Sequence, residues 1–236
     1  MDNQQGNSHI LEECFESVAY TIGALMGDGQ IKKYSLSNGA IDYNVNIRCM
    51  DLDIICKVCS EINNYFGKDI RPHEYKNPNG TLMFRASFGN EFTYEFFNYF
   101  ISVKALLPQE VFVSSRKAKT SFIAGLFDTD GWIAETKRPQ AKYGVGWKIG
   151  YAARFPTLVE DVSRLLMKSG VKVGGIRKEV SGYGTTMYKI YPNIRSFIDS
   201  GFYFFTSRKA ERIERYKLFV CPQSYVEPSE TIMSSP

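Results

Sequence analysis

Two short apolar segments of this 236-residue chain each end in an aspartate followed by a glycine. The first reads IGALMGDG and contains Asp28, and the second reads IAGLFDTDG and contains Asp130, 102 positions later. Two carboxylates that meet in a partly buried place repel each other unless a cation lies between them. Hard oxygen ligands with room for water and phosphate suit Mg²⁺. These residue types indicate metal-assisted phosphodiester hydrolysis, provided that the fold brings the two aspartates together.

Small residues at helical spacing show how the two segments could meet. Gly23 and Gly27 lie four positions apart, and Gly125 and Thr129 repeat this spacing. On a helix, such positions share one face and let a second backbone approach closely. We therefore expect two helices that pack against each other through these four residues and end side by side at the aspartates. The glycine after each aspartate then turns the chain into a strand.

The elements predicted after the two aspartates follow the same order. In the first half, strands are expected at 29–36, 43–49, 69–76 and 81–88, with helices at about 51–67 and 91–103. In the second half, strands are expected at 131–137, 144–154, 173–180 and 185–191, with helices at 156–170, 193–201 and 207–220. This repeat predicts an α+β fold of two αββαββα modules with antiparallel sheets, related by a pseudo-twofold axis.

The domain organisation follows from this repeat. We expect an N-terminal tail at 1–14, a first module at 15–107, a second module at 108–220 that includes a linker at 108–119, and a C-terminal tail at 221–236. Residues 1–115 carry a net charge of −5 and the remainder +9, a balance that suits a polyanionic partner in the second half. The chain has no apolar run of membrane-spanning length, and its polar, acidic start is unlike a targeting peptide. We expect an intracellular protein without a membrane partner, in a bacterial or phage cytoplasm or in an organelle.

The two segments resemble the paired LAGLIDADG motifs of homing endonucleases, in the single-chain form with two motifs. LFDTDG is close to the family consensus, IGALMGDG is a looser variant, and the matching repeat covers residues from about 15 to 219. The resemblance implies the LAGLIDADG homing endonuclease fold in a monomer with internal pseudo-symmetry. It also implies a site-specific endonuclease that cuts both strands of a long asymmetric DNA target across the minor groove and leaves short 3′ overhangs. The implied cofactor is Mg²⁺ or Mn²⁺, with Ca²⁺ expected to bind without supporting efficient cleavage.

The resemblance assigns the metal site residue by residue. The family's metal-binding acid directly precedes the last glycine of the motif, which makes Asp28 and Asp130 the catalytic carboxylates, and the metal site also includes Gly27 and Thr129. Asp128 lies two residues earlier, and the first motif has Met26 in that place. We therefore expect Asp128 to cap or pack near the helix interface and not to bind metal.

Two lysines are candidates for assisting the reaction. VKALLPQEV and GFYFFTSRKAERI resemble the family elements that place a basic residue near each metal site, which nominates Lys104 and Lys209 as catalytic, with Arg208 as the rival of Lys209. The expected role is to polarise or orient the attacking water and to offset the charge of the phosphate.

The polar faces of the strands are expected to bind base edges in two successive major grooves. Counting along the strands in steps of two assigns this role to Gln30, Lys32, Tyr34, Asn44, Asn46, Arg48, Arg71, His73, Tyr75, Arg85, Ser87, Trp132, Ala134, Thr136, Arg138, Lys148, Arg154, Arg177, Met187 and Lys189. As a set they form a polar surface with few acids, although any single residue could instead contact phosphate or only solvent.

Three other functions are compatible with parts of this pattern. An RNA maturase of the same fold, which binds intron RNA, can keep both acids and is not distinguished by sequence. A DNA-binding regulator without nuclease activity has no need for Asp28 and Asp130. An intein insert would need a starting Cys or Ser and a final His-Asn, whereas this chain starts with Met-Asp and ends in SETIMSSP.

Overall fold

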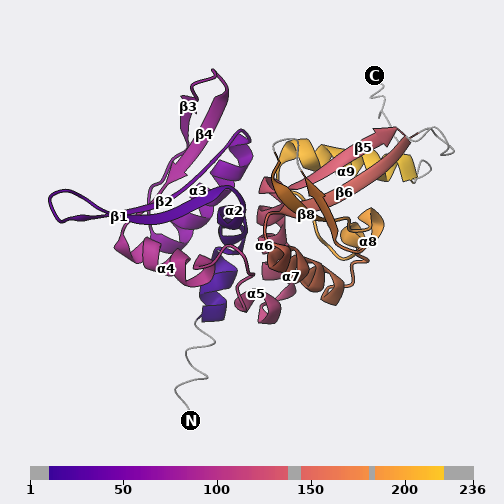
Figure 1. Ribbon diagram of the computed structural model, residues 1–236, viewed down its shortest axis with the longest axis horizontal. Helices are drawn as coiled ribbons and strands as arrows, with labels where there is room; N and C mark the ends of the chain where they lie inside the picture. The colour runs from indigo at the N-terminus through magenta and orange to yellow at the C-terminus, as the bar shows by residue number, and fades with distance from the viewer. Residues whose placement is uncertain (1–10, 138–144, 181–183, 221–236) are drawn as a thin grey trace, which may run out of the picture.

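A computed structural model describes residues 11–137, 145–180 and 184–220 (Figure 1). Most of the predicted N-terminal tail, all of the predicted C-terminal tail and Arg138 lie outside the described residues. Within the described ranges, no helix is long and apolar enough to cross a membrane.

The first half follows the predicted order. Residues 11–17 are helical, and the labelled elements are α2 (Ala19–Asp28), β1 (Gly29–Ser35), β2 (Ile41–Cys49), α3 (Leu52–Phe66), β3 (His73–Lys76), β4 (Leu82–Ser87) and α4 (Glu91–Ile101). The four strands form an antiparallel sheet in the order β1-β2-β4-β3. Local chemistry sets the ends of its helices: Gly67 takes the left-handed conformation after α3, at φ 63°, and the Asn90 side chain caps α4.

The second half repeats this arrangement. Its elements are α5 (Glu110–Val113), α6 (Arg116–Thr129), β5 (Gly131–Lys137), β6 (Val145–Ala153), α7 (Pro156–Lys168), β7 (Arg177–Val180), β8 (Thr186–Ile190), α8 (Ile194–Asp199) and α9 (Ser207–Val220). The sheet order β5-β6-β8-β7 is the counterpart of the first sheet, and all its pairs are antiparallel. The two sheets flank the central pair α2 and α6, and α4, α5 and α7 lie below them in Figure 1.

Some element boundaries differ from the prediction. β3 begins only at His73 and β7 only at Arg177, because the residues before them form irregular connections. Helix α5 and the start of α6 both lie inside the segment 108–119. The Ser115 side chain accepts a hydrogen bond from the Ala118 backbone N–H, which explains why α6 begins at this point.

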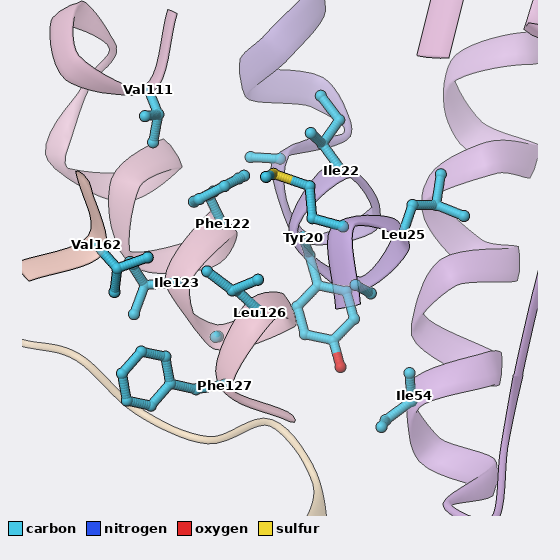
Figure 2. Packing of buried hydrophobic residues seen from close by; sticks show 14 of the residues in the cluster. Tyr20, Ile22, Leu25, Ile54, Val111, Phe122, Ile123, Leu126, Phe127 and Val162 are labelled. Atoms are coloured by element: carbon cyan, nitrogen blue, oxygen red, sulfur yellow. The ribbon is translucent and has the colours of Figure 1, made fainter. Parts of the chain in front are cut away.

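Helices α2 and α6 form the centre of the hydrophobic core. From Ala19 to Met26 every residue of α2 is buried, and α6 is buried from Phe122 to Asp128. Figure 2 shows Leu25 with Ile54 of α3 on one side of this pair, and Ile123 with Val162 of α7 on the other. The pair therefore joins the cores of both modules, and its geometry decides where the two aspartates lie.

Candidate active site

The crossing of α2 and α6 has twofold geometry and depends on two glycines. A Cβ atom added to Gly23 would lie 2.1 Å from the carbonyl oxygen of Phe122, and one added to Gly125 would lie 2.1 Å from that of Tyr20. The two contacts are equivalent, because both pairs of positions are 102 residues apart. No side chain larger than hydrogen fits at either point without separating the helices.

Asp28 and Asp130 lie together where this helix pair ends. Asp28 is the last residue of α2, and Asp130 directly follows α6. A Cβ on Gly27 would be 3.2 Å from Oδ2 of Asp130 and 2.1 Å from Oγ1 of Thr129, so the end of α6 touches the end of α2. Strands β1 and β5 begin at the next residues, Gly29 and Gly131. The site is thus the point at which both sheets start.

Burial raises the cost of ionising both carboxyl groups. Burial raises the pKa of Asp130 to about 6, and the negative charge of Asp28 contributes to this rise. Asp28 is more exposed to solvent, but partial desolvation raises its pKa as well. Lys104 and Lys209 oppose both shifts through their positive charges without cancelling them. The site therefore holds two carboxylates that burial leaves poorly solvated, and a bound cation would stabilise their ionised forms.

Lys104 and Lys209 bind the turns that carry the aspartates. The ammonium group of Lys104 donates to the carbonyl oxygens of Gly27 at 3.3 Å and Gly29 at 2.6 Å. Lys209 is 4% exposed and donates to three carbonyl oxygens, of Phe127 at 2.8 Å, Asp128 at 2.6 Å and Gly131 at 2.7 Å. Burial lowers the pKa of Lys104, and it lowers that of Lys209 to about 8.

These bonds change the expected role of Lys209. An ammonium group has three N–H donors, and here all three point to backbone carbonyls, so Lys209 has no donor left to orient a water molecule. Its geometry instead fixes the backbone around Asp130 and places a positive charge behind it. Arg208, the rival candidate, pairs instead with Asp51 at 3.0 Å.

Asp128 lies inside a buried hydrogen-bond network and does not reach the metal site. It is 2% exposed, and its carboxylate accepts from the Tyr20 hydroxyl at 2.9 Å, the Thr206 hydroxyl at 2.9 Å and the Phe205 backbone N–H at 3.0 Å. Sequence reasoning missed Tyr20 and Thr206, although an aspartate within an apolar helix requires such donors. The network holds the loop before α9, and with it Lys209, against α6.

Each module also forms hydrogen bonds with the loop that carries the other module's lysine. On α3, the Asp53 carboxylate accepts from the Ser207 backbone N–H at 2.6 Å. On α7, Asp161 accepts from the Leu107 backbone N–H at 3.1 Å, and the Thr157 hydroxyl donates to the Ala105 carbonyl at 2.7 Å. The two lysine loops are therefore positioned by both halves of the chain.

The predicted DNA-binding residues of the first module mostly share one face of its sheet. Register places Gln30 opposite Asn46, Lys32 opposite Asn44, and both Arg48 and His73 opposite Arg85. Tyr34, Tyr75 and Ser87 continue the same alternation along β1, β3 and β4.

Two residues of this set differ from the prediction. Arg71 precedes β3 and pairs with Asp69 at 2.9 Å, because the chain there has not yet entered the sheet. Asn46 is only 3% exposed, because its neighbours cover it, so its amide is not available for direct contact with a base.

The second module presents a different face. Trp132 covers Gly150, where a Cβ atom would lie 2.3 Å from the indole ring. Register places Ala134 opposite Lys148, Thr136 opposite Gly146, and Arg177 opposite Lys189. The Thr136 hydroxyl donates to the Gly146 carbonyl at 3.0 Å. Met187 lies opposite Glu179 on β8, and Arg154 directly follows β6. The face contains one acid that the prediction left out, Glu179, whose carboxylate pairs with Lys189.

The comparison with known sequences identifies the second half of the chain. A sequence family described as the LAGLIDADG-like domain matches residues 117–216. This part of the chain is similar to the LAGLIDADG-like domain. The match confirms the resemblance predicted from the two motifs. A search of curated protein sequences finds no significant match.

Solved structures show the same fold over most of the chain. Mesophilic variants of the homing endonuclease I-DmoI superpose with a TM-score of 0.56 at 17% identity, covering 79% of this chain and 93% of theirs. I-DmoI in complex with DNA and Ca gives 0.55 at 17% identity, over 79% and 87% of the two chains. The LAGLIDADG homing endonuclease I-SmaMI, bound to cleaved DNA, gives 0.53 at 12% identity, over 87% and 89%. The predicted LAGLIDADG homing endonuclease fold is confirmed.

The residues at the site fit a hard divalent cation only in part. Among the described residues, no group of three or more His, Cys, Asp and Glu side chains could hold a metal ion. The available donors are the two carboxylates of Asp28 and Asp130, so water and phosphate oxygens would have to complete the shell, as Mg²⁺ tolerates. The Gly27 carbonyl already accepts from Lys104, and the Thr129 hydroxyl donates to Leu126 at 3.0 Å. The Gly27 carbonyl therefore contributes to the turn and the Thr129 hydroxyl to the end of α6, and neither is needed as a metal ligand.

Proposed function

We propose that this LAGLIDADG protein is a site-specific homing endonuclease that hydrolyses both strands of a double-stranded DNA target. The observation that carries the proposal is the convergence of Asp28 and Asp130 at the shared end of α2 and α6, where both sheets begin. Two partly desolvated carboxylates at this point would be stabilised by a cation between protein and phosphate. The LAGLIDADG fold agrees with this assignment.

The protein's own residues would position the DNA and the reacting phosphates. Asp28 and Asp130 would hold one end of the cation shell, while Lys104 and Lys209 fix the backbone of both turns and reduce the repulsion between the carboxylates. A bound Mg²⁺ or Mn²⁺ would supply an activated water and charge stabilisation for the leaving oxygen. I-DmoI has been solved with DNA and Mn and with DNA and Ca, which supports a divalent cation here.

The arrangement of the two sheets supports a long, asymmetric target. Each sheet starts at an aspartate and extends away from the helix pair, so the polar faces would lie in successive major grooves with the aspartates at the minor groove between them (Figure 1). Cleavage there would leave short 3′ overhangs. One chain holds both aspartates and both sheets, so a monomer suffices.

The test is cleavage of a randomised DNA library in Mg²⁺ by wild type, Asp28→Asn and Asp130→Asn, with Glu160→Gln on the exposed face of α7 as control. We expect wild type and Glu160→Gln to cut a common site. Each aspartate variant should lose about a hundredfold or more in rate, as is usual when a group that stabilises transition-state charge is removed.

Two results would contradict the proposal. Aspartate variants that cut as fast as wild type would show that the catalytic assignment is wrong. A wild-type protein that cuts no DNA but binds intron RNA tightly would identify a maturase instead.

A further inference from the structure

Four polar side chains on β1 and β2 form one hydrogen-bonded group, which we call the amide cluster: Gln30, Asn44, Asn46 and Arg48. Asn46 lies at its centre and is 3% exposed. Its Nδ2 donates to Oε1 of Gln30 at 3.3 Å and to Oδ1 of Asn44, and its Oδ1 accepts from Nε of Arg48 at 3.2 Å. Register places Gln30 directly opposite Asn46, so the cluster lies on one face of the sheet.

Arg48 fixes the orientation of every amide in the cluster. A guanidinium group can only donate, so the oxygen of Asn46 must face Arg48. The Asn46 nitrogen then faces Gln30 and Asn44, which must both turn their oxygens inward. The groups turned away from Asn46 are therefore Nε2 of Gln30, Nδ2 of Asn44 and the terminal nitrogens of Arg48, and all of these are donors.

We propose that the amide cluster makes the first module prefer guanine at the base pairs it contacts, with Asn46 as a positioning residue. The inference rests on the proposed function. In the major groove guanine offers two acceptors, N7 and O6, whereas cytosine offers a donor and adenine offers one acceptor and one donor. Asn and Gln usually bind adenine through their oxygen and nitrogen together, but here the oxygens of Gln30 and Asn44 both point toward Nδ2 of Asn46 and away from the groove. A surface of donors alone matches guanine best, because thymine offers only one acceptor, O4, beside its methyl group.

The second module contains no counterpart of the cluster. At the positions 102 residues later it has Trp132, Gly146, Lys148 and Gly150. The guanine preference should therefore appear in one half of the target only. The other half serves as a reference within the same binding experiment.

The experiment is selection of a randomised double-stranded DNA library by binding in Ca²⁺, followed by sequencing. Wild type should enrich guanine at two or more positions of one half-site, by about tenfold over adenine or cytosine. In Asn46→Asp the central group only accepts, so Gln30 and Asn44 must turn their nitrogens inward and their oxygens outward. At the positions they contact, the preference should move from guanine to adenine or cytosine. The control Asn64→Asp adds the same charge on the exposed face of α3 and should leave the profile unchanged.

A second variant keeps the test decisive if Asn46→Asp does not fold, as judged by circular dichroism. Gln30→Met removes one donor from the cluster and should abolish the guanine preference at one position while the others keep it. Two results would overturn this inference alone. One is a wild-type protein that selects target sites without enriching guanine in either half. The other is an unchanged base preference in Gln30→Met or in a folded Asn46→Asp protein. A wild-type protein that enriches no sequence would overturn the proposed function and this inference with it.

Discussion

Replacing Asp130 by asparagine should stabilise the metal-free protein. The side chain is half-buried beside Asp28, and its pKa rises from an ordinary value of 3.8 to about 6. That difference corresponds to about 3 kcal/mol by which the folded state disfavours the ionised carboxylate. Asparagine has nearly the same shape and no charge, so Asp130→Asn should recover up to about 3 kcal/mol at pH 7. In a chain of this size that corresponds to a rise in Tm of roughly 6–12 °C.

The pH dependence gives this effect its signature. The carboxyl group ionises near pH 3.8 in the unfolded chain but near pH 6 in the folded protein. Wild-type stability should therefore fall as pH rises from about 4 to about 6, and the loss should be complete at pH 7. Asp130→Asn has no carboxyl group at this position and so lacks this loss of stability. The two proteins should therefore have similar stability at pH 4 and differ most at neutral pH.

The assay is urea unfolding in EDTA at several pH values, with Glu160→Gln as control for loss of an exposed carboxylate. Adding Mg²⁺ should narrow the gap at pH 7, because a cation bound by the folded wild type stabilises it by mass action, by about 2.7 kcal/mol at a hundred times its Kd. If Asp130→Asn is no more stable than wild type at pH 7 in EDTA, the two carboxylates do not strain the folded state and the reasoning fails.

Two further predictions concern the helix pair and its polar network. Gly125→Ala places a Cβ atom 2.1 Å from the Tyr20 carbonyl and should destabilise the protein by about 3 kcal/mol in thermal unfolding, whereas Gly174→Ala, whose nearest neighbour would be 3.8 Å away, should have little effect. Equal Tm values for these two variants would show that the helices can separate freely. Asp128→Asn exchanges an acceptor oxygen for a donor opposite Thr206 and Phe205 and should cost about 2 kcal/mol in urea unfolding, more than Tyr20→Phe, which removes a single bond. The opposite order would show that the network contributes little.

The fold could be predicted because each element of the first module has a counterpart at the same place in the second. The four-residue spacing of Gly23 and Gly27, repeated by Gly125 and Thr129, indicates a close helix crossing, and a glycine directly after each aspartate favours a turn there. Both are local properties of the sequence, and the structure reproduces them at equivalent positions. Strand alternation also placed most of the polar residues on a common face, because side chains on a strand alternate strictly.

Contacts between distant segments could not be predicted in the same way. Arg208 and Lys209 are adjacent on α9, but Arg208 pairs with Asp51, the residue before α3, whereas Lys209 donates to the Gly131 carbonyl beside Asp130. The burial of Asn46 depends on three neighbours that alternation places near it but cannot orient. Sequence pattern therefore identifies which residues gather at a surface, and the hydrogen-bond partners decide which of them remain available to a ligand.

The two halves of the chain have the same residues at key positions where they pack against each other, and different residues on the sheet faces that would contact DNA. Gly23 and Gly125, like Asp28 and Asp130, occupy equivalent positions because a twofold helix crossing requires the same small residue and the same endpoint on each side. On the sheets, Gln30 corresponds to Trp132 and Asn46 to Lys148, pairs with no shared chemistry. A homodimer would present two identical faces and read a palindrome. With both modules in one chain, each sheet can differ while the helix pair keeps both aspartates in place, so the proposed DNA target should have two unlike halves.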